Sequence, residues 1–431
     1  PSDYDTWAQM GCRGWSYEDV LPLFKKSETF PEGEDEYRGR DGELLVENHR
    51  TVLGPTHRFV EAAQEAGYPY SEDLNGRLYE GVGYAQMTRR GRFRGSTART
   101  FLRAATGRAN LQIRTHCVVT RLRVERGRCV GLSYTEQGSA RELRANAEVV
   151  LCGGAVNSPQ LLQVSGIGPG DHLQSIGVKV VHDLPGVGAN LQDHYVVRVM
   201  HRLKRGQVSL NEVRRPPRLW LEAARWLALG DGVLTNGVTA ANLFCASREG
   251  LAGPDLQLLF TPASFDPDRF GDMDRFPGAT IAVCPLRPQS RGEIMARSAD
   301  PLESPAIRPR YLSAEDDYRV LLKGVAIARE VLSAPAFAGI SEGETSPGSE
   351  VTSDEALREF ARNTAVTLYH PVGTCKMGED RMAVVDPELR VHGIEGLRVA
   401  DASIMPNLTS GNTNAPTIMI GEKCAQLITT R

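Results

Sequence analysis

The stretch EVVLCGGAVNSPQLL, residues 148–162, predicts a strand, a tight turn and a helix in direct succession. Residues 148–152 are almost wholly apolar, as in a strand of a sheet that is covered on both faces. Gly153 and Gly154 permit a tight turn, and the Asn-Ser-Pro sequence that follows supplies an N-cap and a first-turn proline for a helix through Leu162. A strand that passes through glycines into a helix N-terminus is typical of a phosphate-facing unit. The stretch therefore predicts an α/β fold.

Further strands are predicted on both sides of this unit, as short runs of β-forming residues between glycine or polar turns. They cover residues 111–115, 118–124, 130–135 and 397–400. A second group of strand signals lies between residues 255 and 310, with a hairpin at residues 290–292 that leads into residues 293–296. This second group is typical of an antiparallel sheet, so the fold class is α/β with mixed α+β character.

Three helix starts resemble capping boxes, in which a hydroxyl residue precedes an acidic residue by three positions. These pairs are Ser16 with Asp19, Ser313 with Asp316, and Thr352 with Glu355. The last two head long amphipathic helices, and Pro335 ends the first of these. A terminal helix is predicted from Asn414 to about Thr429, with Pro416 in its first turn. The first 90 residues mix short helical signals with Gly- and Pro-rich loops, which is typical of covering structure.

Composition excludes several classes of protein. The 431 residues are enough for two domains, because single cores stop growing at about 250–300 residues. With 53 acidic and 50 basic residues and no block of like charge, we expect a small-molecule partner and no nucleic acid. The eight scattered cysteines form no Cys-x-x-Cys pair, which predicts no metal site and a cytoplasmic protein with reduced thiols. No apolar run of about 18 residues is present, so no transmembrane span is expected.

Two motifs near the C-terminus carry residues suited to acid–base chemistry: YHPVGTCKMG, residues 369–378, and GNTNAPT, residues 411–417. An imidazole titrates near neutrality, so His370 can accept a hydroxyl proton. Asn414 has both a donor and an acceptor with which to hold a substrate oxygen. A histidine before a proline is often structural, and Asn414 can equally cap the terminal helix, so these motifs alone leave both interpretations open.

The chain resembles the glucose-methanol-choline (GMC) oxidoreductase family along its whole length, closest to bacterial FAD-dependent alcohol dehydrogenases and choline dehydrogenase-like proteins. Residues 153–168 resemble the second signature of that family, and other motifs follow in the order of the family. These motifs lie at residues 3–7, 96–102, 110–111, 184–194, 369–378 and 411–417. The resemblance implies an FAD-dependent enzyme with a mixed-sheet FAD-binding domain and a substrate domain that has an antiparallel sheet flanked by helices.

The resemblance also implies residue roles. His370 is the position of the catalytic base, and Asn414 orients the alcohol oxygen. The positions that approach FAD are Val119 at the adenine, Gly153 and Gly154 by close backbone approach, Asp401 and Ala402 near the ribityl and pyrophosphate groups, and Thr417 at the flavin ring. The positive end of the terminal helix would stabilise negative charge on the reduced flavin. No metal ligand is implied.

Residues 91–195 and 370–431 are then predicted to form a partial FAD-binding domain. Residues 1–90 form a cover, and residues 196–369 form the substrate-binding domain. In the family a strand and a Gly-x-Gly-x-x-Gly turn come first, and here they would precede Pro1. We therefore expect a chain that is truncated at its N-terminus, with central strands lost and with apolar surface exposed on the remaining ones.

The function expected from the resemblance is oxidation of a neutral primary alcohol to an aldehyde, with hydride transfer to flavin N5. Ala240 stands where the choline branch has a glutamate that pairs with the quaternary ammonium, so a cationic substrate is disfavoured. The electron acceptor, whether a quinone, another carrier or O2, is left open, as is attachment at the periphery of a membrane. Two alternatives also stay open: an inactive, cofactor-free fragment of such an enzyme, and a flavin-dependent, non-redox protein like the hydroxynitrile lyases.

Overall fold

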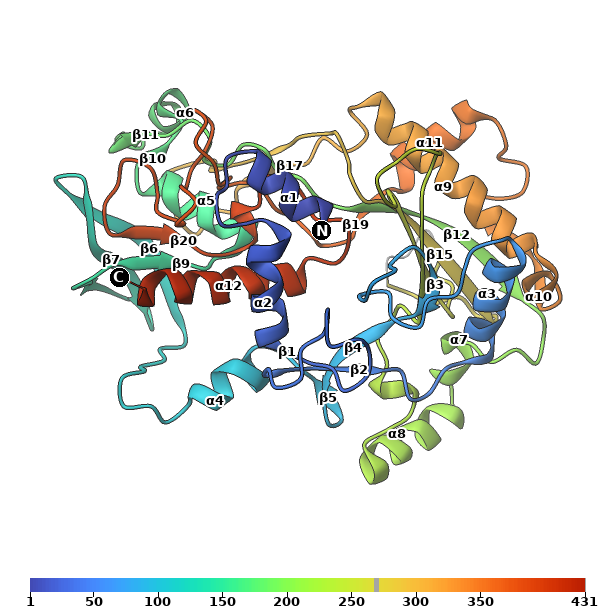
Figure 1. The fold of residues 1–431 in the computed structure, drawn as a ribbon. Coiled ribbons are helices and arrows are strands. Elements are labelled where there is room, and N and C mark those ends of the chain that lie inside the picture. The colour runs from blue at the N-terminus through green and yellow to red at the C-terminus, as the bar shows by residue number, and fades with distance from the viewer. Residues whose placement is uncertain (267–270, 431) are drawn as a thin grey trace.

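The computed structural model describes residues 1–266 and 271–430, which form two lobes side by side (Figure 1). Each lobe has its own hydrophobic core. The mixed α/β class predicted from the sequence is confirmed. No described helix has both the length and the apolar character needed to cross a membrane, and the described residues include no cluster of three or more potential metal ligands.

The first lobe is built around the strand–turn–helix unit predicted from residues 148–162. Its sheets are a parallel pair of β9 (Val149–Leu151) and β20 (Leu397–Val399), and an antiparallel sheet of β6 (Cys117–Glu125), β7 (Arg128–Glu136) and β8 (Ser139–Arg144). Its main helices are α5 (Gly154–Val164), which follows β9, and α12 (Asn414–Thr429), which packs against α2 (Tyr17–Ser27). The apolar residues of β9 and β20 face this core, and Leu397 and Val399 are buried there.

The second lobe contains a seven-stranded, mainly antiparallel sheet, in the order β18-β12-β15-β14-β13-β3 with β19 also on β12. The strands are β3 (Gly81–Tyr84), β12 (Tyr195–Leu203), β13 (Ala241–Cys245), β14 (Leu256–Thr261), β15 (Gly278–Pro285), β18 (Ser341–Ser346) and β19 (Val366–Thr367). This is the antiparallel sheet expected from residues 255–310. The helices on its outer face are α3 (Gly54–Glu65), α9 (Glu315–Ser333), α10 (Pro335–Ala338) and α11 (Asp354–Thr364).

The two faces of this sheet are lined by alternate residues of each strand. On β12, Val197 and Val199 point into the core beneath the helices. Val196 points to the other face and packs with Phe244 and Leu286 in a smaller cluster. Because the helices occupy the outer side in Figure 1, this second face is turned toward the first lobe. The region between the lobes is therefore bordered by the strand ends of both.

The N-terminal segment does more than cover the surface. Trp7 and Trp15 are fully buried in the first core, whereas Phe59 and Val60 belong to the second. The predicted cover thus takes part in both cores, and the proposed division into domains stays a prediction. The small elements of this region are α1 (Ser2–Gln9), β1 (Glu28–Thr29), β2 (Leu44–Asn48), β4 (Gln86–Arg90) and β5 (Phe93–Arg94).

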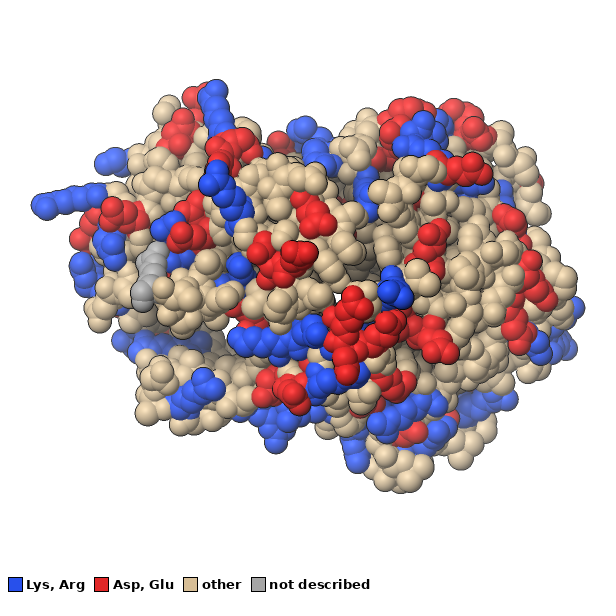
Figure 2. All heavy atoms as spheres, in the orientation of Figure 1, with Lys and Arg blue, Asp and Glu red and all other residues tan. Residues whose placement is uncertain are grey.

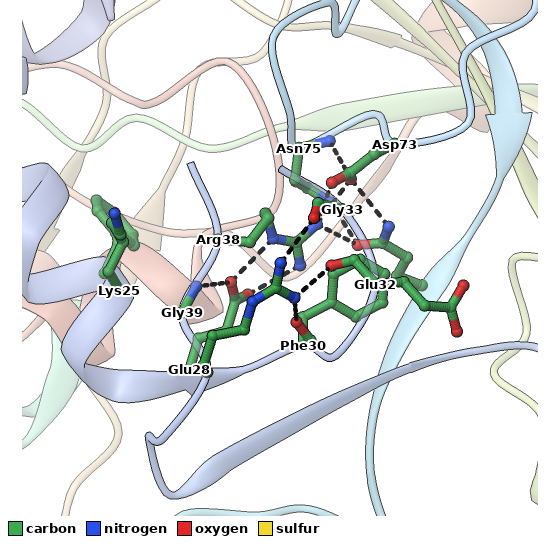
Figure 3. Close-up of polar contacts among 12 residues, drawn as sticks. Lys25, Glu28, Phe30, Glu32, Gly33, Arg38, Gly39, Asp73 and Asn75 are labelled. Carbon is green, nitrogen blue, oxygen red and sulfur yellow. Dashed lines mark hydrogen bonds and ion pairs between the residues drawn. The ribbon is translucent and has the colours of Figure 1, made fainter. Parts of the chain in front are cut away.

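One arginine ties the cover together. The guanidinium of Arg38, which is 3% exposed, donates to Glu28 Oε1 at 2.9 Å and to Asp73 Oδ1 at 2.7 Å. It also donates to Gln86 Oε1 at 3.0 Å, and Asn75 joins the same network (Figure 3). Removing one partner of a buried ion pair leaves a charge without compensation and lowers the stability of the fold by about 3–5 kcal/mol. This network links residues 28–39 to residues 73–86.

The remaining elements are short connections. They are a π-helical turn (Ala98–Leu102), α4 (Arg103–Ala105), β10 (Ile167–Gly168), α6 (Gly170–Ser175), β11 (His182–Asp183), α7 (Leu210–Val213), α8 (Arg218–Leu229), β16 (Glu293–Met295), β17 (Ala306–Arg308) and 3-10 turns at Val233–Thr235 and Ala402–Ile404.

Several predicted element boundaries were wrong. Residues 111–115 form no strand and are exposed. Helix α5 begins at Gly154, so Asn157, Ser158 and Pro159 lie inside it rather than at its start. The residues predicted to pair in a hairpin at 290–292 do not do so, because β16 pairs instead with β17. Strand β8 was missed because its sequence, SARELR, is mostly polar, and all six of its residues are exposed.

The helix caps were predicted with mixed success. Ser16 and Asp19 form the capping box expected at α2. Helix α9 instead begins after Ala314, and its start carries no side-chain cap from Ser313. At α11 the cap is Ser353 rather than Thr352. The terminal helix runs from Asn414 to Thr429 as predicted, with Thr413 at its N-cap position.

Candidate active site

His370 lies in a turn that a buried carboxylate holds from behind. Asp193 Oδ1 accepts a hydrogen bond from the backbone N–H of His370 at 2.8 Å. Asp193 Oδ2 accepts from the hydroxyls of Thr367, at 2.6 Å, and of Tyr311. Within the turn, Tyr369 takes a positive φ of 61°, which non-glycine residues seldom adopt. The carboxylate of Asp193 therefore fixes the backbone from which the His370 side chain extends.

A second histidine determines which nitrogen of His370 carries a proton. His194 Nε2 lies 3.1 Å from the backbone oxygen of Leu286, which can only accept, so that nitrogen is protonated. In neutral His194 the other nitrogen, Nδ1, must then accept. Its partner is His370 Nδ1 at 3.0 Å, which therefore donates. The proton of His370 is thus held on Nδ1, and the lone pair of Nε2 can accept a hydrogen bond or a proton.

Burial keeps both rings neutral. His194 is fully buried, and desolvation followed by repulsion from His370 lowers its pKa to about 3. Desolvation alone lowers the pKa of His370 to about 4. Burial also raises the pKa of Asp193 above its usual value, against the opposing effect of its hydrogen bonds from Thr367, Tyr311 and the backbone. At neutral pH the site therefore presents an uncharged imidazole able to accept a proton at Nε2.

The asparagine nearest to this lone pair is Asn412. Its Nδ2 lies 3.3 Å from His370 Nε2, and an amide nitrogen can only donate, which agrees with the tautomer assigned to His370. Asn414, chosen from the sequence, is the first residue of α12 and is exposed. Its side chain makes no hydrogen bond with His370 among the described contacts. Both amides belong to the same turn, two residues apart.

The predicted cofactor residues gather at the N-termini of α5 and α12. Asp401 Oδ2 accepts from the backbone N–H of Gly154 at 2.9 Å and from the Ser158 hydroxyl at 2.6 Å. Its other oxygen accepts from the N–H of Ser403 at 2.8 Å. The N–H of Gly153 donates to the Ser158 hydroxyl at 3.0 Å. Asp401 therefore joins the end of β20 to the start of α5, and neither glycine amide is left to donate to a phosphate.

This turn nevertheless suits a flat ligand that approaches closely. Gly154 has a φ of 77°, and an added Cβ there would meet no atom within 4 Å. Gly153 is exposed and Gly154 is partly exposed. At α12 the N–H groups of Asn414 and Ala415 make no hydrogen bond with described residues, so this helix end carries free donors and partial positive charge. These features fit the pyrimidine end of a flavin. Figure 2 shows the surface hollowed between α12 and α4.

The other predicted cofactor residues flank this region. Val119 is half-buried on β6, opposite Tyr134 of β7. The carbonyl of Ala402 accepts a hydrogen bond from the N–H of Gly373 at 3.4 Å, which joins the turn after β20 to the motif at residues 369–378. Thr417, in the first turn of α12, donates its hydroxyl to the Thr413 carbonyl at 2.7 Å. Its backbone is thereby held within the helix, and its role at the flavin ring stays a prediction.

Sequence reasoning missed the residues that support His370. His194 was interpreted as a structural residue, and Asp193, Thr367 and Tyr311 were given no role. The adjacent pair Asp193-His194 was a usable signal, because a carboxylate beside an imidazole is a common catalytic pairing. The partners of this pair lie 92 or more residues away in the chain, so no local pattern could reveal that the pair contacts His370.

Comparison with known proteins agrees with the resemblance seen in the sequence. Residues 1–196 match the N-terminal family model, and residues 288–421 match the C-terminal one, both described as GMC oxidoreductase. Similar curated proteins include the oxygen-dependent choline dehydrogenases of Pectobacterium carotovorum subsp. carotovorum (strain PC1) and Escherichia coli O17:K52:H18 (strain UMN026). Each is 43% identical, and the alignments cover 100% and 99% of this chain and 77% of each relative.

Solved structures give the same result. The pyridoxine 4-oxidase from Mesorbium loti superimposes with a TM-score of 0.88 at 28% identity, covering 100% of this chain and 81% of the oxidase. A fungal aryl-alcohol oxidase superimposes with a TM-score of 0.88 at 25% identity, covering 99% of this chain and 82% of that one. The predicted cofactor, FAD, is confirmed because the chain matches both models of the GMC oxidoreductase family, which depends on FAD. The chain belongs to the GMC oxidoreductase family.

Proposed function

We propose that this oxidoreductase converts a neutral primary alcohol to an aldehyde, with His370 as the general base. The observation that carries the proposal is the neutral imidazole whose proton is held on Nδ1 by His194 at 3.0 Å. Nε2 is then the nitrogen that can accept the hydroxyl proton of an alcohol. Because the pKa of His370 is lowered to about 4, the ring is ready to accept without first losing a proton.

FAD, when bound, would supply at flavin N5 the acceptor for the hydride that leaves the alcohol carbon. The residues of this chain provide the rest. His370 Nε2 takes the hydroxyl proton, and Asn414 holds the oxygen as negative charge develops on it. Residues at the α5 and α12 N-termini, with Val119, Ala402 and Asp401 beside them, would border the cofactor. Asp401 acts there by organising the turn, because its oxygens already accept three hydrogen bonds.

The sheet face beside His370 supports a neutral substrate. Val196, Phe244 and Leu259 form an apolar cluster there. Arg198 lies on the same face of β12 as Val196, interacts electrostatically with Tyr369, and makes no ion pair with a described residue. An unpaired cation repels a quaternary ammonium group, which costs about 1 kcal/mol or more at short range. Ala240, where the choline branch has a glutamate, supplies no opposing charge.

Choline is the second candidate, because the curated relatives at 43% identity are named choline dehydrogenases. The two substrates differ in one permanent positive charge, so the choice between them depends on Arg198 and its neighbours. A hydroxynitrile-lyase activity has no structural observation in its favour. The electron acceptor also stays a prediction.

The test is anaerobic mixing of flavin-loaded protein with alcohols, followed by the loss of flavin absorbance. We expect a simple primary alcohol, such as benzyl alcohol or 1-butanol, to bleach the flavin faster than choline at equal concentration. The variant Arg198→Ala should narrow that difference, and Arg308→Ala, which lies on a distant exposed strand, is its matched control. Faster bleaching by choline would reject the neutral substrate, and no bleaching by any alcohol would reject alcohol oxidation itself.

A further inference from the structure

Helix α8 turns an apolar stripe to the solvent. No residue of this helix is buried. Positions i, i+1, i+4, i+7 and i+8 from Trp220 lie on one side of a helix. All five are apolar and exposed: Trp220, Leu221, Ala224, Leu227 and Ala228. The side chains of Trp220, Leu221 and Leu227 are 68%, 67% and 63% exposed. A surface helix normally points such a stripe into the core, so α8 has the reverse orientation.

Contacts on the opposite side hold α8 in this orientation. The Trp226 ring packs edge-on against Phe93, with ring centres 6.0 Å apart, and its N–H donates to the carbonyl of Arg92. Glu222 accepts from the backbone N–H of Val233 at 2.9 Å. Arg225 pairs with Asp231 at 3.5 Å. The helix therefore docks on the protein through polar and aromatic contacts, and these leave its aliphatic side outward.

Two further apolar side chains are exposed at the end of the helix and after it in the chain. Leu229 at its C-terminal end is 73% exposed, and Val238 in the next segment is 65% exposed. In Figure 1, α8 projects from the second lobe at the bottom of the view, away from the sheet. Figure 2 shows uncharged side chains at this tip with Lys and Arg side chains beside them. Contiguous exposed apolar surface with a charged rim is typical of an interaction site.

Several arginines lie just before α8 and at its start. A groove of about 620 Å³ just before the helix is lined by Arg214, Arg215, Pro216 and Arg275. Arg214 and Arg275 make no ion pair with a described residue, and the same holds for Arg218 at the start of α8. Uncompensated guanidinium groups bind phosphate oxygens well, because their planar donors match two oxygens at once. The apolar stripe is thus bordered by groups suited to phosphate.

We propose that α8 docks this protein on an anionic phospholipid surface, with Trp220, Leu221 and Leu227 in the interface and the nearby arginines on lipid phosphates. Tryptophan and leucine on one side of a short helix, with arginine on the rim, is the pattern of helices that lie in a membrane surface. A second copy of the chain suits this face less, since a two-fold contact would bring the same arginines together. The proposal needs no membrane-crossing helix.

The experiment is flotation of the purified protein with vesicles. We expect binding to vesicles that contain phosphatidylglycerol, weaker binding to pure phosphatidylcholine, and release at high salt. The triple variant Trp220→Ser, Leu221→Ser, Leu227→Ser should reduce binding at least about 100-fold, because three large apolar side chains would no longer be buried in the interface. The control Leu78→Ser, Leu302→Ser, at positions that are 70% and 68% exposed elsewhere, should bind as the parent does.

A second measurement follows Trp220 directly. Its fluorescence should shift to the blue on addition of anionic vesicles, and Trp220→Phe should abolish the shift. The rate of alcohol oxidation, measured with a soluble redox dye, should be the same in the triple variant and the parent. Loss of lipid binding can then be distinguished from failure of the proposed function. The inference is overturned if the parent protein does not float with anionic vesicles, or if the triple variant floats equally well. It is also overturned if the protein is a dimer that the triple variant dissociates while no lipid binding occurs.

Discussion

The two sides of the candidate site are built in opposite ways. The backbone N–H and both ring nitrogens of His370 have protein partners: Asp193 accepts from the backbone, His194 contacts Nδ1, and Asn412 contacts Nε2. Around the N-terminus of α12 the amides of Asn414 and Ala415 have none among the described residues. The difference teaches that the protonation state of the base is set by the protein alone. The other side is built to be completed by a ligand.

The largest expected effect tests the buried side of this comparison. His370→Ala removes the proposed base and should lower the rate of flavin reduction by an alcohol about 10²–10⁴-fold. The measurement is anaerobic stopped-flow, with flavin content determined beforehand. His392→Ala is the control, because His392 bonds only the distant carbonyl of Gly378 and should leave the rate unchanged. Equal rates in parent and His370→Ala would show that the base is another residue.

Asn414 and Asn412 lie where the two sides of the site meet, and comparing their variants tests which amide orients the substrate oxygen. Asn414→Ala should lower the rate of flavin reduction about 10²-fold or more, because the developing charge on the substrate oxygen loses its donor. Asn412→Ala removes only the 3.3 Å contact to His370 and should cost less than about tenfold. Steady-state kinetics of the two variants, side by side, measure this. If Asn412→Ala is the more damaging change, the structure has identified the substrate-orienting amide and the sequence prediction was wrong.

The role of His194 can be separated from a purely structural one. His194→Phe keeps a ring but leaves His370 Nδ1–H without its acceptor, and we expect kcat/KM to fall at least about tenfold. His194→Gln can still accept from His370 and donate to Leu286, so it should retain activity within a few-fold. The second readout is ¹⁵N NMR of the histidine rings, which reports the tautomer of His370 without any turnover. Identical tautomers in parent and His194→Phe would contradict the positioning role.

The open side is tested through cofactor retention. Asp401→Ala frees the N–H of Gly154 and the hydroxyl of Ser158, and it loosens the turn between β20 and α5. We expect weaker flavin binding by about tenfold, since the three charge-assisted hydrogen bonds that organise this turn are lost. Flavin fluorescence during dialysis measures the retention. Asp300→Ala, in an exposed loop, serves as the control. Unchanged retention would mean that this turn does not organise the cofactor side.

The smallest effect concerns pH. In the folded protein His194 and His370 have pKa values lowered to about 3 and about 4, below the usual 6.5. The unfolded chain therefore binds more protons at pH 4–6, and stability is lost as pH falls below 6.5, by up to about 1.4 kcal/mol per pH unit and group. Urea denaturation at pH 7 and pH 5 measures this. His194→Gln should reduce the loss, and an unchanged slope would argue that His194 is protonated in the folded state.

Local chemistry made the first lobe predictable from the sequence. The strands at 118–124, 130–135 and 148–152, and the terminal helix, all appeared near their predicted bounds. A glycine follows each of these strands within three residues, and Pro416 lies in the first turn of the helix, so the backbone is punctuated close to these elements. Residues 111–115 have the same β-forming composition, yet they form no strand, because no neighbouring strand pairs with them among the described residues. A β-forming composition is therefore not enough to form a strand when no neighbouring strand is available for pairing.

The candidate site was predicted only where a motif carried it. His370 and the α12 turn were found, whereas Asp193, His194 and Tyr311 were not, because they meet only after β12 and β19 pair. Helix α8 is a second case in which a sequence pattern does not predict the tertiary contacts. Its apolar periodicity resembles that of α9, but α9 buries its stripe and α8 does not. The pattern gives the width of an apolar face, and only the fold decides which way it points.

The hydrogen-bond chain behind His370 ends on the carbonyl of Leu286, directly after β15, and a backbone atom has no side chain to exchange. The reactive nitrogen is therefore assigned by the sheet rather than by any residue that lines the substrate space. Substrate preference and the basicity of His370 therefore depend on different parts of the protein, and each can change without the other in engineered variants or in relatives. Side chains such as Val196, Phe244 and Leu259 can be varied to admit other alcohols, and the basicity of the imidazole should survive as long as the strand keeps its place.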